Sequence, residues 1–435
     1  MNENVSSATA GSQGKKLIPK SILLPFIFLT SCFAWWGLAN NMTDTLLSAF
    51  KKIMSMSDFQ TSWIQIAFYG SYFCLALPAA IFIKKFSYKS GVLLGLGMFV
   101  LGSLLFYPAS LTINYFHFLA ALYILAGGLS ILETSANPYI FSMGPEETGT
   151  RRLNLAQSFN PIGSILGVLL SKLFILSHLN QASAQERALM APDKLKEIQH
   201  AELSAVMGPY VTVALVLLVL WIIIAWMKMP KISDEDKRVD LIPTFKRLIK
   251  IRHYRWGVIA QFFYVGAQIG VWSFTIRYVM KELNINEEQA STYYMISLIL
   301  FAASRFISTW LMRYMTPAKL LALLSALAML FTLGTIFGHG YIGVYSLIAI
   351  SGCMSLMFPT IFGLSVRGLG DDTKIGGSGL IMAILGGALL TALQGQVSDA
   401  TGSINMAYIV PLICFVVIGY YSFYKSQQDL KPAAA

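Results

Sequence analysis

Apolar residues in this chain of 435 residues gather in long runs that short polar segments separate. A run of about 20 apolar residues is long enough for a helix that crosses a bilayer. We count about twelve such runs, near residues 21–49, 59–83, 90–109, 114–143, 153–178, 206–227, 255–280, 288–312, 317–338, 341–366, 375–398 and 405–424. The pattern predicts an all-α membrane protein in which these runs are the transmembrane helices.

The longest charged stretch of the chain, residues 228–252, divides the runs into two groups of six. We therefore expect two six-helix bundles, at 21–227 and 253–425, joined by a cytoplasmic linker over 228–252. Residues 1–20 are expected to form a cytoplasmic leader, and residues 426–435 a tail. The order of elements thus predicts a protein built from two halves.

One segment of the linker has the pattern of a separate helix. Leu241, Phe245, Leu248 and Ile249 fall on one helical face. Such a face fits an amphipathic helix on the inner membrane surface. A solvated linker helix is the alternative.

The two groups of runs repeat each other weakly. Residues 138–141, Pro-Tyr-Ile-Phe, are matched by residues 359–362, Pro-Thr-Ile-Phe, and an acidic pair with Thr follows each of them. A glycine-rich run comes next in both halves. Parallel six-helix repeats are typical of major-facilitator transporters, in which two bundles rock about a central site. We therefore expect the major facilitator fold and alternating access.

Composition and charge favour a membrane transporter over other classes of protein. Only 12% of the residues are charged, against about 25% in a typical soluble domain. The net charge of +11 requires no nucleic-acid partner, because Lys and Arg gather in alternate loops as the positive-inside rule demands. This distribution predicts a multi-pass protein of the bacterial inner (plasma) membrane with both termini cytoplasmic.

Asp44 and Glu133 are lone carboxylates inside long apolar runs. A charged side chain at the centre of a bilayer costs about 2.5–3.5 kcal/mol on insertion scales, so such residues face a polar interior or are protonated. The first half offers Lys172 as a base, but that residue lies near a helix end and can extend to the surface. Burial favours the neutral carboxyl group. The two acids are therefore candidates for proton coupling.

Amide side chains share helix faces with one another and with these acids in the first half. Residues three or four positions apart lie on one face, which pairs Asn41 with Asp44, Asn137 with Glu133, and Gln157 with Asn160. Amides can bind the hydroxyl groups of a neutral polyol, or they can hold helices together. We predict that Asn41, Asn137, Gln157 and Asn160 bind substrate.

The second half offers aromatic rings and fewer amides. Four residues of the seventh run, spaced by three or four, share a face: Gln261, Tyr264, Gln268 and Trp272. Sugars stack their C–H faces on aromatic rings, although aromatic residues in membrane helices also serve as packing or interface anchors. We predict that these four residues bind substrate. Arg305, near an inner helix end, is expected to be structural and to reach carbonyl groups or lipid phosphates.

Several segments resemble the L-fucose:proton symporters, in the fucose–galactose–glucose branch of the major facilitator superfamily. They are WGLANNMTDTLL at 36–47, LETSANPYI at 132–140, RLNLAQSFN at 152–160 and FPTIFGLSVRGLGDDTKIG at 358–376. The resemblance implies that Asp44 and Glu133 are the two essential carboxylates and that Glu133 carries the proton. It also implies that Asn41, Gln157 and Asn160 line the sugar cavity.

Two positions depart from that family. The symporters carry Asn where this chain has Thr43, and Tyr where it has Phe358. The missing hydroxyl group at Phe358 removes one sugar contact, so we predict that this substrate-facing position tunes sugar preference.

Together these features predict proton-coupled symport of a neutral monosaccharide, with L-fucose the first candidate, by a monomer in a lipid bilayer. The sequence has no phosphate-binding loop, metal-ligand cluster or hydrolase triad, so we expect no enzyme activity, no cofactor and no metal. Three alternatives stay open. They are a glucose/galactose transporter of the same branch, coupled to H⁺ or Na⁺, a drug:proton antiporter with a wider apolar cavity, and a membrane sugar sensor.

Overall fold

The computed structural model describes residues 16–54, 58–175, 179–180, 182, 186–187, 189–232 and 240–430. The side chains at 43–52, 58–62, 65, 206, 429 and 430 lie outside that description. Within the described part, 12 helical segments are long and apolar enough to cross a membrane. This confirms the number of spans that the runs of apolar residues predict.

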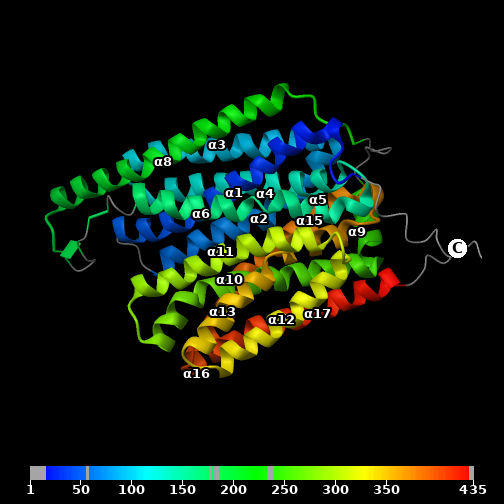
Figure 1. Ribbon diagram of the computed structural model, residues 1–435. Helices are drawn as coiled ribbons and strands as arrows, with labels where there is room; N and C mark the ends of the chain where they lie inside the picture. The colour runs from blue at the N-terminus through cyan, green and yellow to red at the C-terminus, as the bar shows by residue number, and fades with distance from the viewer. Residues whose placement is uncertain are drawn as a thin grey trace, which may run out of the picture.

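The first six spans form the N-terminal half (Figure 1). They are α1 (Leu23–Ile53), α2 (Asp58–Lys85), α3 (Tyr88–Thr112), α4 (Tyr115–Ser142), the interrupted pair α5 (Gly149–Gln157) and α6 (Asn160–Leu170), and α8 (Pro192–Trp226). A π-helical turn, Ser171–Ile175, continues α6. The long helix α8 packs against α3 on the outside of this half.

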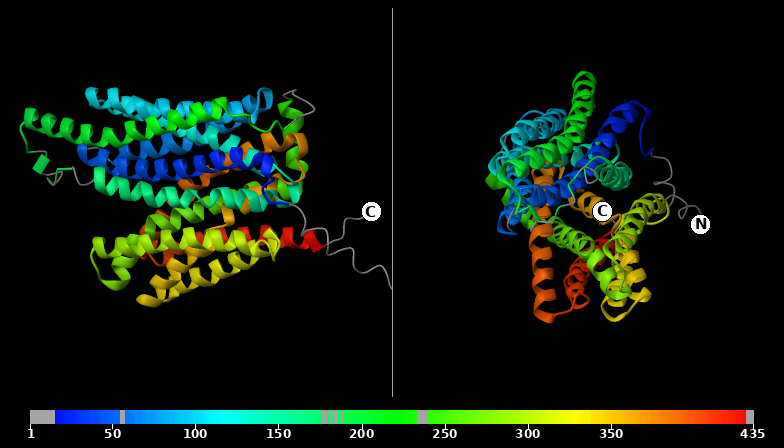
Figure 2. Two further views of the ribbon diagram at one scale, coloured as in Figure 1. Left: turned by 45° about the horizontal axis from the view of Figure 1, so that its top comes forward. Right: turned by 90° about the vertical axis from the view of Figure 1, so that its left-hand side faces the viewer.

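The last six spans form the C-terminal half. They are α10 (Arg252–Leu283), α11 (Glu287–Leu311), α12 (Pro317–Phe337), the pair α13 (Tyr341–Met354) and α14 (Met357–Val366), the pair α15 (Thr373–Met382) and α16 (Gly386–Thr401), and α17 (Ile409–Leu430). Helix α1 begins and α17 ends at the same end of the molecule (Figure 1), which we call the terminal end. Figure 2 shows the two halves side by side, with α15 reaching across to the first half.

The internal repeat extends to irregularities of the helices. Short 3₁₀ turns at Glu146–Thr148 and Gly370–Asp372 carry the two acidic pairs. The fifth span is interrupted between Gln157 and Asn160, and the eleventh span has a 3₁₀ turn at Ala383–Leu385, the matching position. Each half therefore has an irregular turn within one membrane-spanning helix, at the level where the two halves face each other.

Helices α1 and α6 approach closely because two glycines stand at their crossing. A Cβ atom at Gly163 would lie 1.8 Å from the backbone oxygen of Ala34, and one at Gly37 would lie 2.1 Å from that of Asn160. Small residues allow this close packing of helices in a membrane. The contact holds the polar start of α6 against the middle of α1.

The linker contains the predicted helix, α9 (Leu241–Lys250). Its apolar residues divide between two environments, because Leu248 is buried whereas Ile249 is 59% exposed. Arg247 donates to both carboxylate oxygens of Asp372, at 2.7 and 2.9 Å. The helix is thus fastened to the C-terminal half by one buried side and one ion pair, and its other apolar side stays open.

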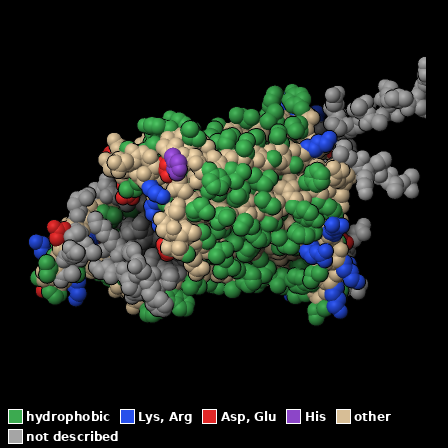
Figure 3. All heavy atoms as spheres, turned by 90° about the horizontal axis from the view of Figure 1, so that it is seen from below, with side chains coloured by type: hydrophobic (Ala, Val, Ile, Leu, Met, Phe, Trp, Pro, Cys, Tyr) green, Lys and Arg blue, Asp and Glu red, His purple; other side chains and the backbone are tan. Residues whose placement is uncertain are grey.

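Polar contacts join the two halves toward the terminal end. The Asn154 amide donates to Thr360 Oγ1 at 3.1 Å, and the Gly368 amide donates to Glu146 Oε1 at 2.6 Å. These contacts hold the two halves together between the centre of the molecule and its terminal end. Figure 3 shows a broad apolar band over the middle of one face, with Lys and Arg side chains gathered toward the terminal end.

Candidate functional site

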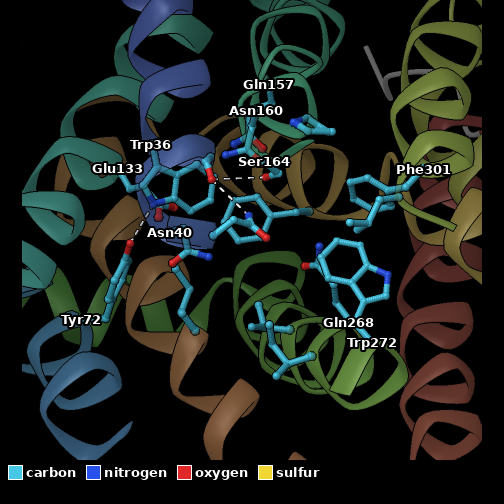
Figure 4. A pocket seen from close by; sticks show the side chains of 18 of the residues that line it. Trp36, Asn40, Tyr72, Glu133, Gln157, Asn160, Ser164, Gln268, Trp272 and Phe301 are labelled. Atoms are coloured by element: carbon cyan, nitrogen blue, oxygen red, sulfur yellow. Dashed lines mark hydrogen bonds between the residues drawn. The ribbon is translucent and has the colours of Figure 1, made fainter. Parts of the chain in front are cut away.

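A cavity of about 100 Å³ lies between the two halves. Its first wall comes from α1, α2, α4, the end of α5 and the start of α6, and its second wall comes from α10, α11, α14 and the turn before α16. Figure 4 shows Glu133, Asn40, Gln157, Asn160 and Ser164 with the rings of Trp36 and Tyr72 on the first wall, opposite Gln268, Trp272 and Phe301 of the second. The site is therefore chemically asymmetric.

Glu133 is the acid of the first wall. It is 2% exposed, and neither of its carboxyl oxygens has a hydrogen bond of good geometry to a described residue. Tyr72 lies beside it, and the Tyr72 hydroxyl accepts a hydrogen bond from Trp36 Nε1 at 2.9 Å (Figure 4). Because Trp36 supplies the donor, the Tyr72 proton is free to be donated to the neighbouring carboxyl group.

Two backbone carbonyl groups of α1 accept hydrogen bonds from polar side chains of the first wall and hold them in place. The Gly37 oxygen accepts from Asn41 at 3.1 Å and from Ser164 at 3.5 Å, and the Phe33 oxygen accepts from Asn160 at 3.3 Å. Asn41 and Asn160 each use the amide nitrogen in these contacts. The Asn160 oxygen can then accept a hydrogen bond from a ligand hydroxyl.

Gln157 is fixed by residues from both halves. Its amide nitrogen donates to Asn137 Oδ1 at 2.6 Å, and its backbone oxygen accepts from Arg305 at 3.0 Å. Arg305 is 2% exposed, donates to the Ser355 oxygen, and lies over the Phe301 ring at 4.6 Å. The expectation that Arg305 reaches carbonyl groups thus agrees with the structure, and the residue also lines the cavity.

Aromatic rings dominate the second wall. Trp272 donates to Ser351 Oγ at 3.2 Å and meets Phe301 edge-on, with ring centroids 4.9 Å apart. Phe358 also lines the cavity. Gln268 is the amide of this wall, and it has no hydrogen bond to another described side chain or backbone group. This wall therefore offers apolar surface, the Gln268 amide and the Arg305 guanidinium group.

The structure brings most of the predicted residues together. Those that line the cavity are Glu133, Asn41, Gln157, Asn160, Gln268, Trp272 and Phe358. Three others lie behind its surface: Asn137 supports Gln157, Tyr264 donates to the Met354 oxygen at 3.2 Å, and Gln261 is fully buried without a described hydrogen bond. Asp44 lies on α1, but its side chain is outside the described part.

The cavity also contains residues that the sequence reasoning did not select. They are chiefly Trp36, Asn40, Tyr72, Ser164, Phe301 and Arg305. Helical spacing contained a signal for three of them, because Trp36 and Asn40 are four positions apart and Ser164 follows Asn160 by four. Phe301 likewise lies four positions before Arg305. The residues three and four positions from Tyr72 are Phe68, Tyr69, Leu75 and Ala76, so no comparable signal marked Tyr72.

This arrangement can bind a small neutral solute that carries several hydroxyl groups. The amides supply donors and acceptors, the rings supply apolar surface, and Glu133 can take up or release a proton. Among the described residues no group of three or more His, Cys, Asp or Glu side chains could hold a metal ion.

Comparisons with known proteins give a consistent result. Residues 26–392 match the Major Facilitator Superfamily. L-fucose–proton symporters of Haemophilus influenzae and Escherichia coli are 40% and 39% identical over 94% of this chain, covering 98% and 94% of their own lengths. A glucose/galactose transporter of Brucella abortus is 33% identical over 92% of this chain and 93% of its own.

Two solved structures are similar over nearly the whole chain. The crystal structures of the E. coli fucose:proton symporter, FucP, and of a Major Facilitator Superfamily transporter, FucP, in the outward conformation each have a TM-score of 0.88 at 39% identity, covering 94% of this chain and 100% of that chain. The fold of this superfamily accounts for the repeat, the twelve spans and the central cavity. The chain belongs to the Major Facilitator Superfamily, in the branch that contains the L-fucose–proton symporters.

Proposed function

We propose that this protein carries L-fucose into the cell together with a proton by alternating access. One observation carries the proposal: a buried carboxyl group, Glu133, stands beside hydroxyl-binding amides in a small cavity between two repeated bundles. The relatives named L-fucose–proton symporters are more similar to this chain than the glucose/galactose transporter, at 40% and 39% identity against 33%. L-fucose is therefore the first substrate to test.

The polar lining of the cavity favours a monosaccharide over a drug. The amide groups of the first wall can bind sugar hydroxyls, whereas a drug:proton antiporter is expected to have a wider apolar cavity. A drug:proton antiporter is accordingly the weaker candidate.

Trp36, Tyr72 and Glu133 link protonation to the cavity. While Glu133 is charged, Tyr72 donates its proton to the carboxylate and the hydroxyl group is unavailable to a ligand. Once Glu133 takes up a proton, the neutral carboxyl group no longer requires a hydrogen bond from Tyr72. The Tyr72 O–H can then turn toward the sugar. Proton loading thereby improves sugar binding, and by linkage sugar binding favours proton loading.

Asp44 is proposed as the second coupling acid. It follows Asn41 by three positions on α1, so the two residues share a helix face. A carboxyl group on that face is placed to respond to sugar bound at Asn41. We expect the Asp44→Asn variant to insert normally and elute as a single species in gel filtration, yet to fail in accumulation.

The contacts between the two halves fit a transporter that is closed toward the terminal end and faces outward. The contacts at Asn154–Thr360 and Gly368–Glu146 join the halves between the cavity and the terminal end. The positive-inside rule puts that end, with both termini and the linker, in the cytoplasm. Sugar and proton then enter from outside, and the monomer rocks within the bilayer as these contacts break.

Purified protein in liposomes tests the proposal. Addition of L-fucose without a sodium gradient is expected to raise the external pH as labelled L-fucose enters. Unlabelled L-fucose should compete better than D-galactose, D-glucose or L-arabinose. Uptake that needs Na⁺ and leaves the pH unchanged, or competition led by D-glucose, would contradict the proposal and favour the glucose/galactose alternative.

A further inference from the structure

Arg305 contacts two backbone carbonyl groups that share an uncommon property. Its guanidinium group donates to the Gln157 oxygen at 3.0 Å and to the Ser355 oxygen. In a regular α-helix, each of these oxygens would accept from the N–H group four residues later. Those residues are Pro161 and Pro359, and proline has no N–H group to donate. The two prolines therefore leave both oxygens in need of another donor, and Arg305 supplies it.

The two oxygens come from interrupted spans in different halves of the molecule. Gln157 ends α5, where the fifth span is interrupted, and Ser355 lies between α13 and α14 in the tenth span. Arg305 itself belongs to α11 of the C-terminal half. Its bond to Gln157 therefore crosses between the halves, whereas its bond to Ser355 fixes the guanidinium group within the C-terminal half. Phe159 and Phe306 make a further contact between the halves, with ring centroids 5.7 Å apart.

The bond between Arg305 and Gln157 lies at the sugar cavity itself. Both residues line the cavity, whereas the contacts that Asn154 and Glu146 make with the other half lie nearer the terminal end. When the terminal end opens, the halves separate below the cavity and the bond between Arg305 and Gln157 breaks. A buried carbonyl group then lacks a donor, which is unfavourable. Opening therefore requires another group to replace this bond.

A bound sugar can replace it. A hydroxyl group is both a donor and an acceptor, so one sugar hydroxyl between the walls can donate to the Gln157 oxygen and accept from Arg305. We propose that Arg305 is a positioning residue that holds the empty transporter closed toward the terminal end and releases it when a sugar bridges the two walls. This inference rests on the proposed transport of a sugar, because a solute without hydroxyl groups cannot make the exchange. The bond biases the empty protein toward the outward-facing state, in which it can load again.

Spin labels on the full-length protein measure the opening of the terminal end. The changes Phe86→Cys and Tyr314→Cys place one label on each half, at residues 56% and 71% exposed at that end. Cys74→Ser removes the exposed native cysteine. Double electron–electron resonance in liposomes then gives the distances between the labels. Without sugar, Arg305→Gln should raise the ratio of the longer, open distance to the shorter, closed one about tenfold or more, because a hydrogen bond from a charged group is lost.

Pro161→Ala tests the same bond without changing the arginine. The new N–H group at position 161 can donate to the Gln157 oxygen within the helix, which weakens the bond from Arg305. The variant should shift the distances in the same direction as Arg305→Gln but less. Both changes together should give little more than Arg305→Gln alone, because they act on one bond. Pro161→Ala also keeps the proposal testable where Arg305→Gln fails to fold.

Pro209→Ala and Arg277→Gln are the matched controls. Pro209 lies inside α8, on the outside of the N-terminal half, and Arg277 lies over the Phe274 ring at 4.3 Å on α10. Neither lines the sugar cavity, so both variants should keep the wild-type distances. Wild-type distances in Pro161→Ala, or effects of Pro161→Ala and Arg305→Gln that add, would overturn the proposal. If L-fucose leaves the wild-type distances unchanged while both variants still open without sugar, the role of Arg305 stands and the proposed substrate is wrong.

Discussion

The two walls of the sugar cavity come from repeated bundles but differ in chemistry. The first wall has the carboxyl group of Glu133 and the amides of Asn40, Asn41, Gln157 and Asn160 beside aromatic rings such as Trp36 and Tyr72, whereas the second has Trp272, Phe301 and Phe358, with Gln268 and Arg305 as its polar groups. The helix break between Gln157 and Asn160 recurs at Ala383–Leu385, where the side chains are apolar. The two halves thus share an irregular turn at this position, but polar side chains stand at the turn only in the first half. The comparison assigns sugar hydroxyls and protons to the first half, and ring packing to the second.

The largest expected effect of a single substitution on binding falls on the amides of the first wall. Asn160→Ala or Gln157→Ala leaves sugar hydroxyls unpaired, which costs about 1–3 kcal/mol and weakens L-fucose binding roughly 5- to 150-fold. Gln268→Ala, on the second wall, should cost less than either. Calorimetry on detergent-purified protein measures all three. An equal or larger loss at Gln268 would reverse the proposed division between the walls.

Trp272 tests the aromatic wall. Trp272→Ala removes a stacking surface worth about 0.5–1.5 kcal/mol and should weaken sugar binding by roughly two- to twelvefold, whereas Trp272→Phe should keep most of the affinity. Trp310→Ala is a suitable control, because Trp310 is 50% exposed on α11 and does not line the cavity. Wild-type affinity in Trp272→Ala would show that the indole only packs α10.

Tyr72→Phe separates coupling from binding. Without the hydroxyl group, protonation of Glu133 no longer changes a donor in the cavity, so sugar affinity should depend less on pH while exchange of labelled sugar continues. Binding titrations across a pH series in liposomes measure this dependence. Tyr123→Phe, on the exposed side of α4, should behave as the wild type. An unchanged pH dependence in Tyr72→Phe would remove Tyr72 from the coupling path.

The smallest effect is expected at Phe358, where a substitution by Tyr would add a polar group to the second wall. Phe358→Tyr should preserve transport and alter the order of competition among L-fucose, D-galactose and L-arabinose, because a hydrogen-bonding site discriminates between sugars more strongly than an apolar one. The ring lies 6.2 Å from Tyr264, centroid to centroid. An identical order before and after the change would indicate that this ring does not contact sugar.

The sequence predicted the spans and the repeat well because both depend on the length and order of apolar runs. It predicted which face of a helix a residue lies on, but not how deep in the membrane that residue lies. Gln261 and Gln268 share a face of α10, but seven residues of helix separate them by about 10 Å along the axis, and only Gln268 reaches the cavity. Periodicity gives the direction of a side chain, whereas its depth in the membrane depends on how the bundles tilt and pack.

Asn137 illustrates the second limit. It shares a face with Glu133 by spacing, yet a four-residue step turns about 40° around a helix. In the structure that rotation is enough to place Asn137 behind Gln157, which it holds at 2.6 Å. The pairing of Trp36 with Tyr72 joins residues 36 positions apart on different helices. No local pattern could predict such a contact, because it arises only from packing.

Glu133→Gln tests the central claim most directly. The amide resembles the protonated carboxyl group in shape but cannot exchange a proton, so sugar and proton movements should separate. Labelled L-fucose and external pH are recorded together in liposomes, with the wild type alongside. We predict that the variant exchanges L-fucose across the membrane but neither accumulates it against a gradient nor changes the pH. Proton-linked accumulation at the wild-type level in Glu133→Gln would contradict the account.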